Sequence, residues 1–373
     1  MLKKIAVVAA IMLIAAFVYL GAGAESKGAD NFINFRAPYT FLEEGIIVMQ
    51  AYGETLWARK FDPLLTNAAN ATVLMESTDK GYSWAFLYEF EKPIQAIYND
   101  GHGNIFVTVS QDRWASEGTG EVHKSSDGGR TFRKVLDVKA GVPINWNITS
   151  LNGTMFMSEY GYKGASGNNA RRIYRSLNFG DTWEIIYEPA PMEEYHKHKI
   201  LITQEGVIYQ SVGDGEHAKI IKSADNGYSW DVVAQGFHPT SAVAFENHIL
   251  WGLDAGPIHG IAWFDKHTHE MDFVLDLPYP FRGSCYAMAY ARGVVYAVFM
   301  SYVGDYHPGS IFYSTDEGRN WNVFGYIKKS PNDGVGLFNL VVDEQFGYID
   351  LQAPVYHDGA VKQFRGTLRF ELL

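Results

Sequence analysis

Two histidines that lie two residues apart are the feature of this sequence that most resembles part of a metal-binding site. His196 and His198 belong to the run His-Lys-His-Lys-Ile-Leu-Ile, which continues like a strand. Successive side chains of a strand point to opposite sides, so both imidazoles are expected on the same side. A divalent metal ion commonly binds such a pair, and Asp214 or His217 could complete the site. The alternative is an exposed polar start of a strand.

Carboxylates, aromatic rings and basic groups recur in short polar segments that adjoin apolar strands. Asp and Gly are ordinary turn formers, so any one of these carboxylates could serve only a turn. Gathered on one face, the same groups would form a sugar-binding surface, because rings stack on the apolar faces of sugars and charged groups bond hydroxyls. Hydrolysis of a glycosidic bond would use two opposed carboxylates, for which Asp112 and Asp214 are candidates. The candidates for substrate binding are Arg113, Trp146, Glu159, Asp305 and Tyr306.

An octapeptide of the pattern Ser-x-Asp/Asn-x-Gly-x-Ser/Thr/Asn-Trp/Phe must position these segments. The Ser and Asp side chains can bond backbone N–H groups inside a tight turn, and Gly supplies a positive φ. The closing aromatic residue returns the chain into a second strand, so the octapeptide predicts a hairpin and a structural role. Its five copies span residues 77–84, 125–132, 176–183, 223–230 and 314–321.

The spacing of the octapeptides predicts the architecture. Their starts are separated by 48, 51, 47 and 91 residues, and the last gap is nearly two periods. Decayed copies fit at 259–273, with Phe264 in place of Ser, and at 359–372, with Phe364 in that place. Seven repeats of this length, built from short strands, predict an all-β propeller of seven four-stranded blades. We expect one domain over 25–373, with the segment near Asn31–Tyr39 helping to close the ring.

These octapeptides resemble the Asp-box, or BNR, repeats of the sialidase-like β-propellers. The relatives of that superfamily include sortilin-type receptors and several carbohydrate-active enzymes. The resemblance covers nearly the whole chain after residue 24. It implies that the octapeptides lie at the blade periphery as scaffolding, and that a ligand would bind on the opposite face, at a central pocket.

The resemblance also suggests residues for a sialidase-like glycoside hydrolase. The run Phe-Arg-Ala-Pro around Arg36 is similar to the F/Y-R-I-P motif of sialidases, whose arginine clamps the substrate carboxylate, although alanine replaces isoleucine. By position, Arg282 and Arg365 would supply the other two arginines, and Asp62 would be the acid/base. The tyrosine–glutamate pair of that family has no match here. Sialidases have six blades, so a six-bladed ring is the alternative architecture.

The first 24 residues predict export. Lys3 and Lys4 precede an apolar run over Ile5–Leu20, and Gly-Ala-Gly-Ala follows it. This is the pattern of a signal peptide cleaved after Ala24. Without cleavage the run is just long enough to anchor the chain in a membrane. We therefore expect a secreted or membrane-anchored protein that contacts the membrane only through this segment.

Charge and cysteine content narrow the possible partners. A net charge of −11 disfavours nucleic acid, whose binding uses a basic surface. The single cysteine, Cys285, cannot form an intramolecular disulfide. The sequence also has no nucleotide-binding glycine loop and no nucleophile elbow.

Three functional hypotheses remain after these exclusions. The first is a carbohydrate-active enzyme, either a sialidase-like hydrolase or a lyase assisted by a metal ion at His196 and His198. The second is a glycan-binding protein without catalysis. The third is a scaffold at the cell surface whose partner is another protein. The sequence favours recognition or processing of a glycan or glycoconjugate.

Overall fold

The computed structural model describes a large part of the chain, and almost all of it is β-structure. The described residues are 33–62, 71–111, 120–161, 169–190, 196–214, 218–254, 259–277, 283–300, 309–328, 336–357 and 360–373, without the side chains of 353–363. The predicted signal or anchor segment lies outside them. In these ranges no helix has the length and apolar character needed to span a bilayer.

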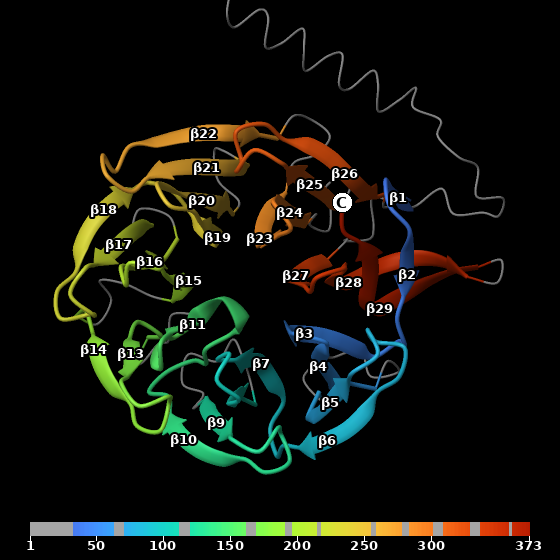
Figure 1. The fold of residues 1–373 in the computed structure, drawn as a ribbon, viewed down its shortest axis with the longest axis horizontal. Coiled ribbons are helices and arrows are strands. Elements are labelled where there is room, and N and C mark those ends of the chain that lie inside the picture. Colours follow the sequence, from blue (N-terminus) through green and yellow to red (C-terminus); the bar gives the residue numbers. More distant parts are fainter. Residues whose placement is uncertain are drawn as a thin grey trace, which may run out of the picture. The chain divides into compact units, whose positions relative to one another are not determined.

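Seven antiparallel sheets stand in a ring around a central axis (Figure 1). Six sheets run through four strands in sequential order, and the one that contains β23–β26 carries a fifth strand, β1, at its outer edge. The remaining sheet joins β27, β28 and β29 to β2 from the N-terminal side of the chain. Short alternating strands joined by tight turns favour this meander. The prediction of a seven-bladed β-propeller is confirmed, and the six-bladed alternative is wrong.

The innermost strands of neighbouring blades contact one another and surround the axis. The second strands behind them are almost completely buried, because both of their faces lie against neighbouring blades. The innermost strands are β3 (Ile46–Tyr52), β7 (Ile94–Asn99), β11 (Ile148–Leu151), β15 (Lys197–Ile202), β19 (Pro239–Ala244), β23 (Ser284–Ala291) and β27 (Gly336–Val342); the second strands are β4 (Thr55–Lys60), β8 (Ile105–Val109), β12 (Thr154–Ser158), β16 (Ile208–Val212), β20 (His248–Leu253), β24 (Val294–Met300) and β28 (Phe346–His357).

The third and fourth strands of each blade form its outer half. Fourth strands such as β6 and β18 are mostly exposed along one face. The third strands are β5 (Val73–Ser77), β9 (Glu121–Ser125), β13 (Ile173–Ser176), β17 (Lys219–Ser223), β21 (Gly260–Asp265), β25 (Gly309–Ser314) and β29 (Ala360–Glu371); the fourth strands are β6 (Ala85–Glu89), β10 (Arg133–Asp137), β14 (Glu184–Tyr187), β18 (Asp231–Gln235), β22 (Met271–Asp276), β26 (Asn322–Ile327) and β2 (Tyr39–Phe41).

The hydrophobic core lies between the blades rather than inside any one of them. One cluster joins Tyr209 of β16 to Trp251 of β20 and Phe264 of β21, so two successive blades share it. Burial of these large rings stabilises the contact by roughly 25 cal/mol for each Å² of apolar surface removed from water. Each blade therefore depends on both of its neighbours.

The octapeptides form the turns between the third and fourth strands, as predicted. In the copy at 223–230, the Ser223 hydroxyl donates to Asp225 Oδ1 at 2.8 Å and accepts from the Gly227 N–H at 2.8 Å. The other carboxylate oxygen of Asp225 accepts from the Ser229 hydroxyl at 2.6 Å. Gly227 has a φ of 90°, a conformation that favours glycine. These bonds fix the turn at the periphery of the blade.

The decayed copy at 259–273 is also a hairpin turn. Phe264 and Met271 pair across β21 and β22. Asp265 Oδ1 accepts from the backbone N–H groups of His267 and Thr268, both at 2.8 Å. A carboxylate shifted by one position thus replaces the serine–aspartate pair of the other copies.

The copy predicted at 359–372 is wrong. Phe364 lies inside the long strand β29, where it pairs with Ala353, and β29 continues to Glu371. The strand runs through this position without interruption, so it leaves no octapeptide turn after Phe364. The fourth strand of this blade comes from the N-terminal side of the chain instead.

Two short N-terminal strands close the ring. The strand β1 (Ile33–Phe35) pairs with β26, and β2 pairs with β29 as the fourth strand of the last blade. Figure 1 shows these strands beside the C-terminal blades. The prediction that this segment closes the ring is confirmed for its described residues. The two ends of the propeller are therefore held by the same blade.

The octapeptide carboxylates make the stability of the fold sensitive to acid. Hydrogen bonds from Ser229 and Ser223 lower the pKa of Asp225 to about 2, from an ordinary value of 3.8. The ionised carboxylate therefore stabilises the folded state above pH 4, and this contribution is lost as the pH falls from about 4 through 2. We predict that Asp225→Asn unfolds at lower urea concentration than the unsubstituted protein at pH 7 and that the difference shrinks towards pH 2. A difference that stays constant across this range would contradict the assignment.

Candidate functional site

A cavity of about 540 Å³ lies on the axis of the propeller. All seven innermost strands contribute to its lining, which places it at the centre of the ring. Polar and apolar groups share the wall. Its charged members among the described residues are Arg59, Lys199 and Asp350.

β-Bulges direct several side chains towards this cavity. In six of the seven innermost strands described here, the register against the second strand shifts by a residue. A bulged residue has no partner of its own in the ladder, and the bulge turns its side chain to a new direction. Bulged residues that line the cavity are Met49, Gln95, Tyr286 and Phe338, and Lys199 lies at the irregular stretch of β15.

Three aromatic rings from two blades form one side of the wall: Trp146 and Tyr160 flank the inner strands β11 and β12, and Tyr286 belongs to β23. Trp146 belongs to the 3-10 turn η2 (Asn145–Asn147), and its ring lies 5.6 Å from Tyr160 and 5.5 Å from Tyr286. The Tyr286 hydroxyl lies 3.2 Å from both carboxylate oxygens of Asp254. The sequence singled out Trp146 for ligand binding but missed Tyr286, because no pattern reveals the bulge that turns it inward.

Lys199 places a cation in the cavity. Its ammonium makes no hydrogen bond or ion pair with the described residues, and burial lowers its pKa to about 8. The other basic residue of the wall, Arg59, donates to the Ile94 carbonyl at 2.9 Å and lies 3.9 Å from the Asp350 carboxylate. The charge of Arg59 is thus balanced, whereas that of Lys199 is available to a ligand. In the sequence, Lys199 is only the last lysine of the His-Lys-His-Lys run, and nothing there marks it as a cavity residue.

The two histidines and Asp214 meet beside the aromatic wall. His196 Nε2 lies 3.0 Å from Asp214 Oδ2, and His198 Nε2 lies 3.7 Å from Asp214 Oδ1. Both imidazoles are buried, while the Asp214 side chain is 37 % exposed. Within the described residues, this is the group of three side chains whose types and spacing could hold a metal ion.

Burial and neighbouring charge shift the acidity of this group. Burial, together with the charge of His196, lowers the pKa of His198 to about 4. Burial raises the pKa of Asp214, but the contact with His196 and the other nearby imidazoles outweigh it and lower the pKa to about 2. Near neutral pH this arrangement offers a neutral imidazole at His198 and a carboxylate at Asp214.

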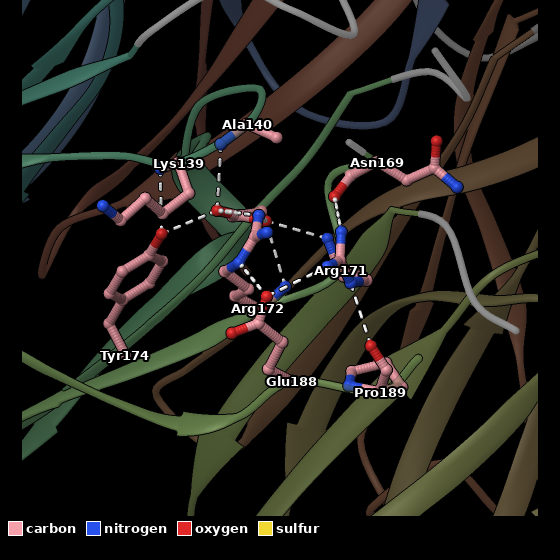
Figure 2. Close-up of polar contacts among 9 residues, drawn as sticks. Lys139, Ala140, Asn169, Arg171, Arg172, Tyr174, Glu188 and Pro189 are labelled. Carbon is pink, nitrogen blue, oxygen red and sulfur yellow. Dashed lines mark hydrogen bonds and ion pairs between the residues drawn. The ribbon is translucent and has the colours of Figure 1, made fainter. Parts of the chain in front are cut away.

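Glu159 lies in a different environment from the one expected of a ligand-binding residue. Its carboxylate is fully buried and accepts from the Tyr174 hydroxyl at 2.6 Å and from the N–H groups of Ala140, Arg171 and Arg172 at 2.8–3.1 Å. The guanidinium of Arg172 adds an ion pair at 3.3 Å. Figure 2 shows these contacts around the labelled donors Ala140, Arg171, Arg172 and Tyr174. They occupy the carboxylate with structural bonds and leave none of it facing the cavity.

Arg36 and Asp62 are not brought to the cavity. Arg36 lies between β1 and β2 at the outer edge, where its N–H donates to the Phe324 carbonyl and its guanidinium donates to the Tyr313 hydroxyl at 2.9 Å. Asp62 is exposed just after β4. Ring closure places Arg36 on the outside, so it does not lie at the central pocket where the resemblance would put a clamping arginine. Predicted site residues outside the described ranges are Asp112, Arg113, Arg282, Asp305 and Tyr306.

Comparison with known proteins identifies the fold and nothing finer. No protein-family description matches the chain, and no curated protein matches it. Among solved structures, YCF48 bound to D1 peptide gives a TM-score of 0.58 with 16 % identity, over 93 % of this chain and 98 % of that one. YCF48 from Cyanidioschyzon merolae gives 0.55 with 16 % identity, over 89 % and 98 %.

A further similar structure belongs to a larger protein. The extracellular domain of BT4673 from B. thetaiotaomicron gives a TM-score of 0.57 with 9 % identity, over 90 % of this chain and 40 % of that one. At such identities these likenesses establish a shared propeller fold. Its function must be argued from the site.

The buried Glu159 network predicts a large effect on stability. Replacing Glu159 by Ala removes the acceptor of several buried donors and breaks the buried ion pair between Glu159 and the Arg172 guanidinium. Breaking a buried pair in this way costs about 3–5 kcal/mol. We expect this loss in the free energy of unfolding from urea titrations of Glu159→Ala. The control Glu54→Gln, at an exposed turn position, should stay within about 0.5 kcal/mol of the unsubstituted protein. Equal stabilities of the two variants would show that the network is not structural.

Proposed function

We propose that this protein is an exported propeller of the Asp-box, sialidase-like type that recognises an acidic glycan in its central cavity. One observation carries the proposal: the Trp146 and Tyr286 rings and the Lys199 ammonium lie in the wall of the same cavity. The peripheral octapeptide turns and the signal-like N-terminus support the superfamily and the export.

The wall has the composition that sugar recognition uses. Flat aromatic surfaces such as Trp146 and Tyr286 cover the apolar face of a pyranose ring. Polar side chains beside them, including Gln95, Asn339 and Asp350, can bond its hydroxyls. The cavity volume of about 540 Å³ falls within the roughly 300–1,000 Å³ of small-molecule sites.

The balance of charge favours an acidic sugar. Arg59 and Asp350 neutralise each other in the described lining, so Lys199 leaves one positive charge in excess. A sugar carboxylate or sulfate would pair with it, and charge-assisted hydrogen bonds of this kind are about twice as strong as neutral ones. We therefore place the acidic group of the glycan at Lys199.

Recognition is better supported than hydrolysis. Asp350 is the carboxylate of the described lining, and hydrolysis commonly employs two. A hydrolytic role would require a second acid from outside the described ranges, such as Asp112 or Asp305. A lyase would instead draw on the histidine pair.

Binding to a glycan array, followed by calorimetry with the best ligand, tests this function. We expect the chain to bind glycans that contain uronic or sialic acids. Lys199→Met should weaken binding about tenfold or more, because a hydrogen bond to a charged group contributes about 1.5–3 kcal/mol. Trp146→Ala should weaken it as well.

Arg36→Ala is the matched control for the loss of a cation. Arg36 lies at the outer edge of the ring, so this variant should bind acidic glycans as tightly as the unsubstituted protein. Folded protein that binds neither acidic nor neutral glycans would contradict the proposal and leave the protein-interaction scaffold as the better hypothesis. Loss of binding in Arg36→Ala alone would move the glycan site to the periphery.

A further inference from the structure

We infer that His196, His198 and Asp214 bind one divalent transition-metal ion, with Zn²⁺ the best match, beside the central cavity. Two imidazole nitrogens and one carboxylate oxygen form a donor set that Zn²⁺ favours. The inference is independent of glycan recognition, because it depends only on the geometry of these three side chains.

The spacing of the donor atoms suits a tetrahedral ion. Zn–N and Zn–O bonds of about 2.0–2.1 Å place the ligands of a tetrahedral site about 3.3 Å apart. The two contacts of Asp214, at 3.0 Å to His196 and 3.7 Å to His198, lie on either side of this value. All three donor atoms lie within 4.8 Å of one another. Small rotations of the side chains would complete the coordination.

The hydrogen bond on the far side of His198 sets its tautomer for metal binding. His198 Nδ1 lies 3.1 Å from the Pro239 carbonyl oxygen, which can only accept. Nδ1 therefore carries a proton, and in the neutral ring Nε2 presents a lone pair. That lone pair faces Asp214 Oδ1, a second acceptor, across 3.7 Å. A cation between them resolves this repulsion, and a carbonyl behind the imidazole is the usual support of a metal-binding histidine.

The backbone of His196 is held in a conformation that L-residues rarely adopt. Its φ is 29°, in the left-handed region. Two hydrogen bonds fix the chain on either side: Gly213 N–H donates to the His196 carbonyl at 3.1 Å, and Lys197 N–H donates to the Glu159 carbonyl at 2.9 Å. The strained backbone brings the His196 imidazole within 4.7 Å of the His198 ring, measured between centroids. Strain of this kind is typical of residues that position a ligand.

The surroundings leave room for a fourth ligand. The Tyr160 ring lies 5.2 Å from His196, and the Trp146 ring lies 6.2 Å from His198, so aromatic walls shield the imidazoles. The half-exposed Asp214 gives access from solvent. Three protein ligands and one position for water or another donor is the arrangement of an open zinc site.

Titration of the purified, chelator-treated full chain with ZnSO₄ in a calorimeter tests the site. We expect one Zn²⁺ per chain and a higher melting temperature in its presence. Co²⁺ should bind at the same place and give the intense visible absorption of a four-coordinate ion. An imidazolium–carboxylate pair would produce the same geometry without metal, and a chain that takes up no Zn²⁺ would establish that pair and overturn the inference.

Single substitutions locate the ion. Asp214→Ala, at a partly exposed position, should weaken Zn²⁺ binding at least about a hundredfold, more than the loss of an outer-shell partner. His198→Ala should abolish the Co²⁺ spectrum. The matched control is His102→Ala, which removes an exposed histidine and should leave both readouts unchanged. Equal Zn²⁺ affinities of Asp214→Ala and His102→Ala would place any bound ion elsewhere and reject the site.

Discussion

Burial of both faces of every blade is the constraint on which this structure depends. The second strands are apolar on both sides, so a blade at the end of an open row would expose one of them to water. Closure of the ring removes that exposure, and it is achieved by β2, which completes the last blade beside β29. Thr367 fastens the same junction, since its buried hydroxyl accepts from the Val48 N–H and donates to the Ile46 carbonyl, both at 2.9 Å. The first and last blades are thus joined by direct hydrogen bonds as well as by β2.

In the closed ring, the outer and inner parts of each blade contribute differently to the structure. The octapeptide turns lie at the periphery, where their hydrogen bonds are satisfied within the turn itself. The innermost strands converge on the axis, where their bulges and the connections between blades direct Tyr286, Lys199 and the histidine pair towards one region. The octapeptide turns and the candidate site therefore belong to the same sheets but have few side chains in common. This separation explains how a regular repeat can surround an irregular centre.

The sequence predicted the parts of the structure that repeat and missed the parts that occur once. Seven blades followed from the spacing of the octapeptides, and even the decayed turn at Phe264 could be found because its hairpin survives. The copy placed at Phe364 was wrong, since ring closure by an N-terminal strand makes a turn unnecessary there. Arg36 was assigned to the wrong place for the same reason. In the sequence, Glu159 resembles the carboxylates of the other polar segments, and only the folded structure shows that its hydrogen-bond partners are buried. The approach of His196, His198 and Asp214 could be anticipated from strand geometry, whereas the inward turn of Tyr286 depends on a bulge that has no sequence signature.

The bulges of the innermost strands have a consequence for how such a centre can change over time. A bulged residue lies outside the register of its ladder, so its replacement leaves the pairing of the flanking residues intact. Met49, Gln95, Tyr286 and Phe338 occupy such positions in four different blades. Each of these four positions can therefore be substituted independently, without a change in the register of its strand. Propellers of this design can acquire new ligand preferences through single replacements at the axis, while the outer turns keep the ring unchanged.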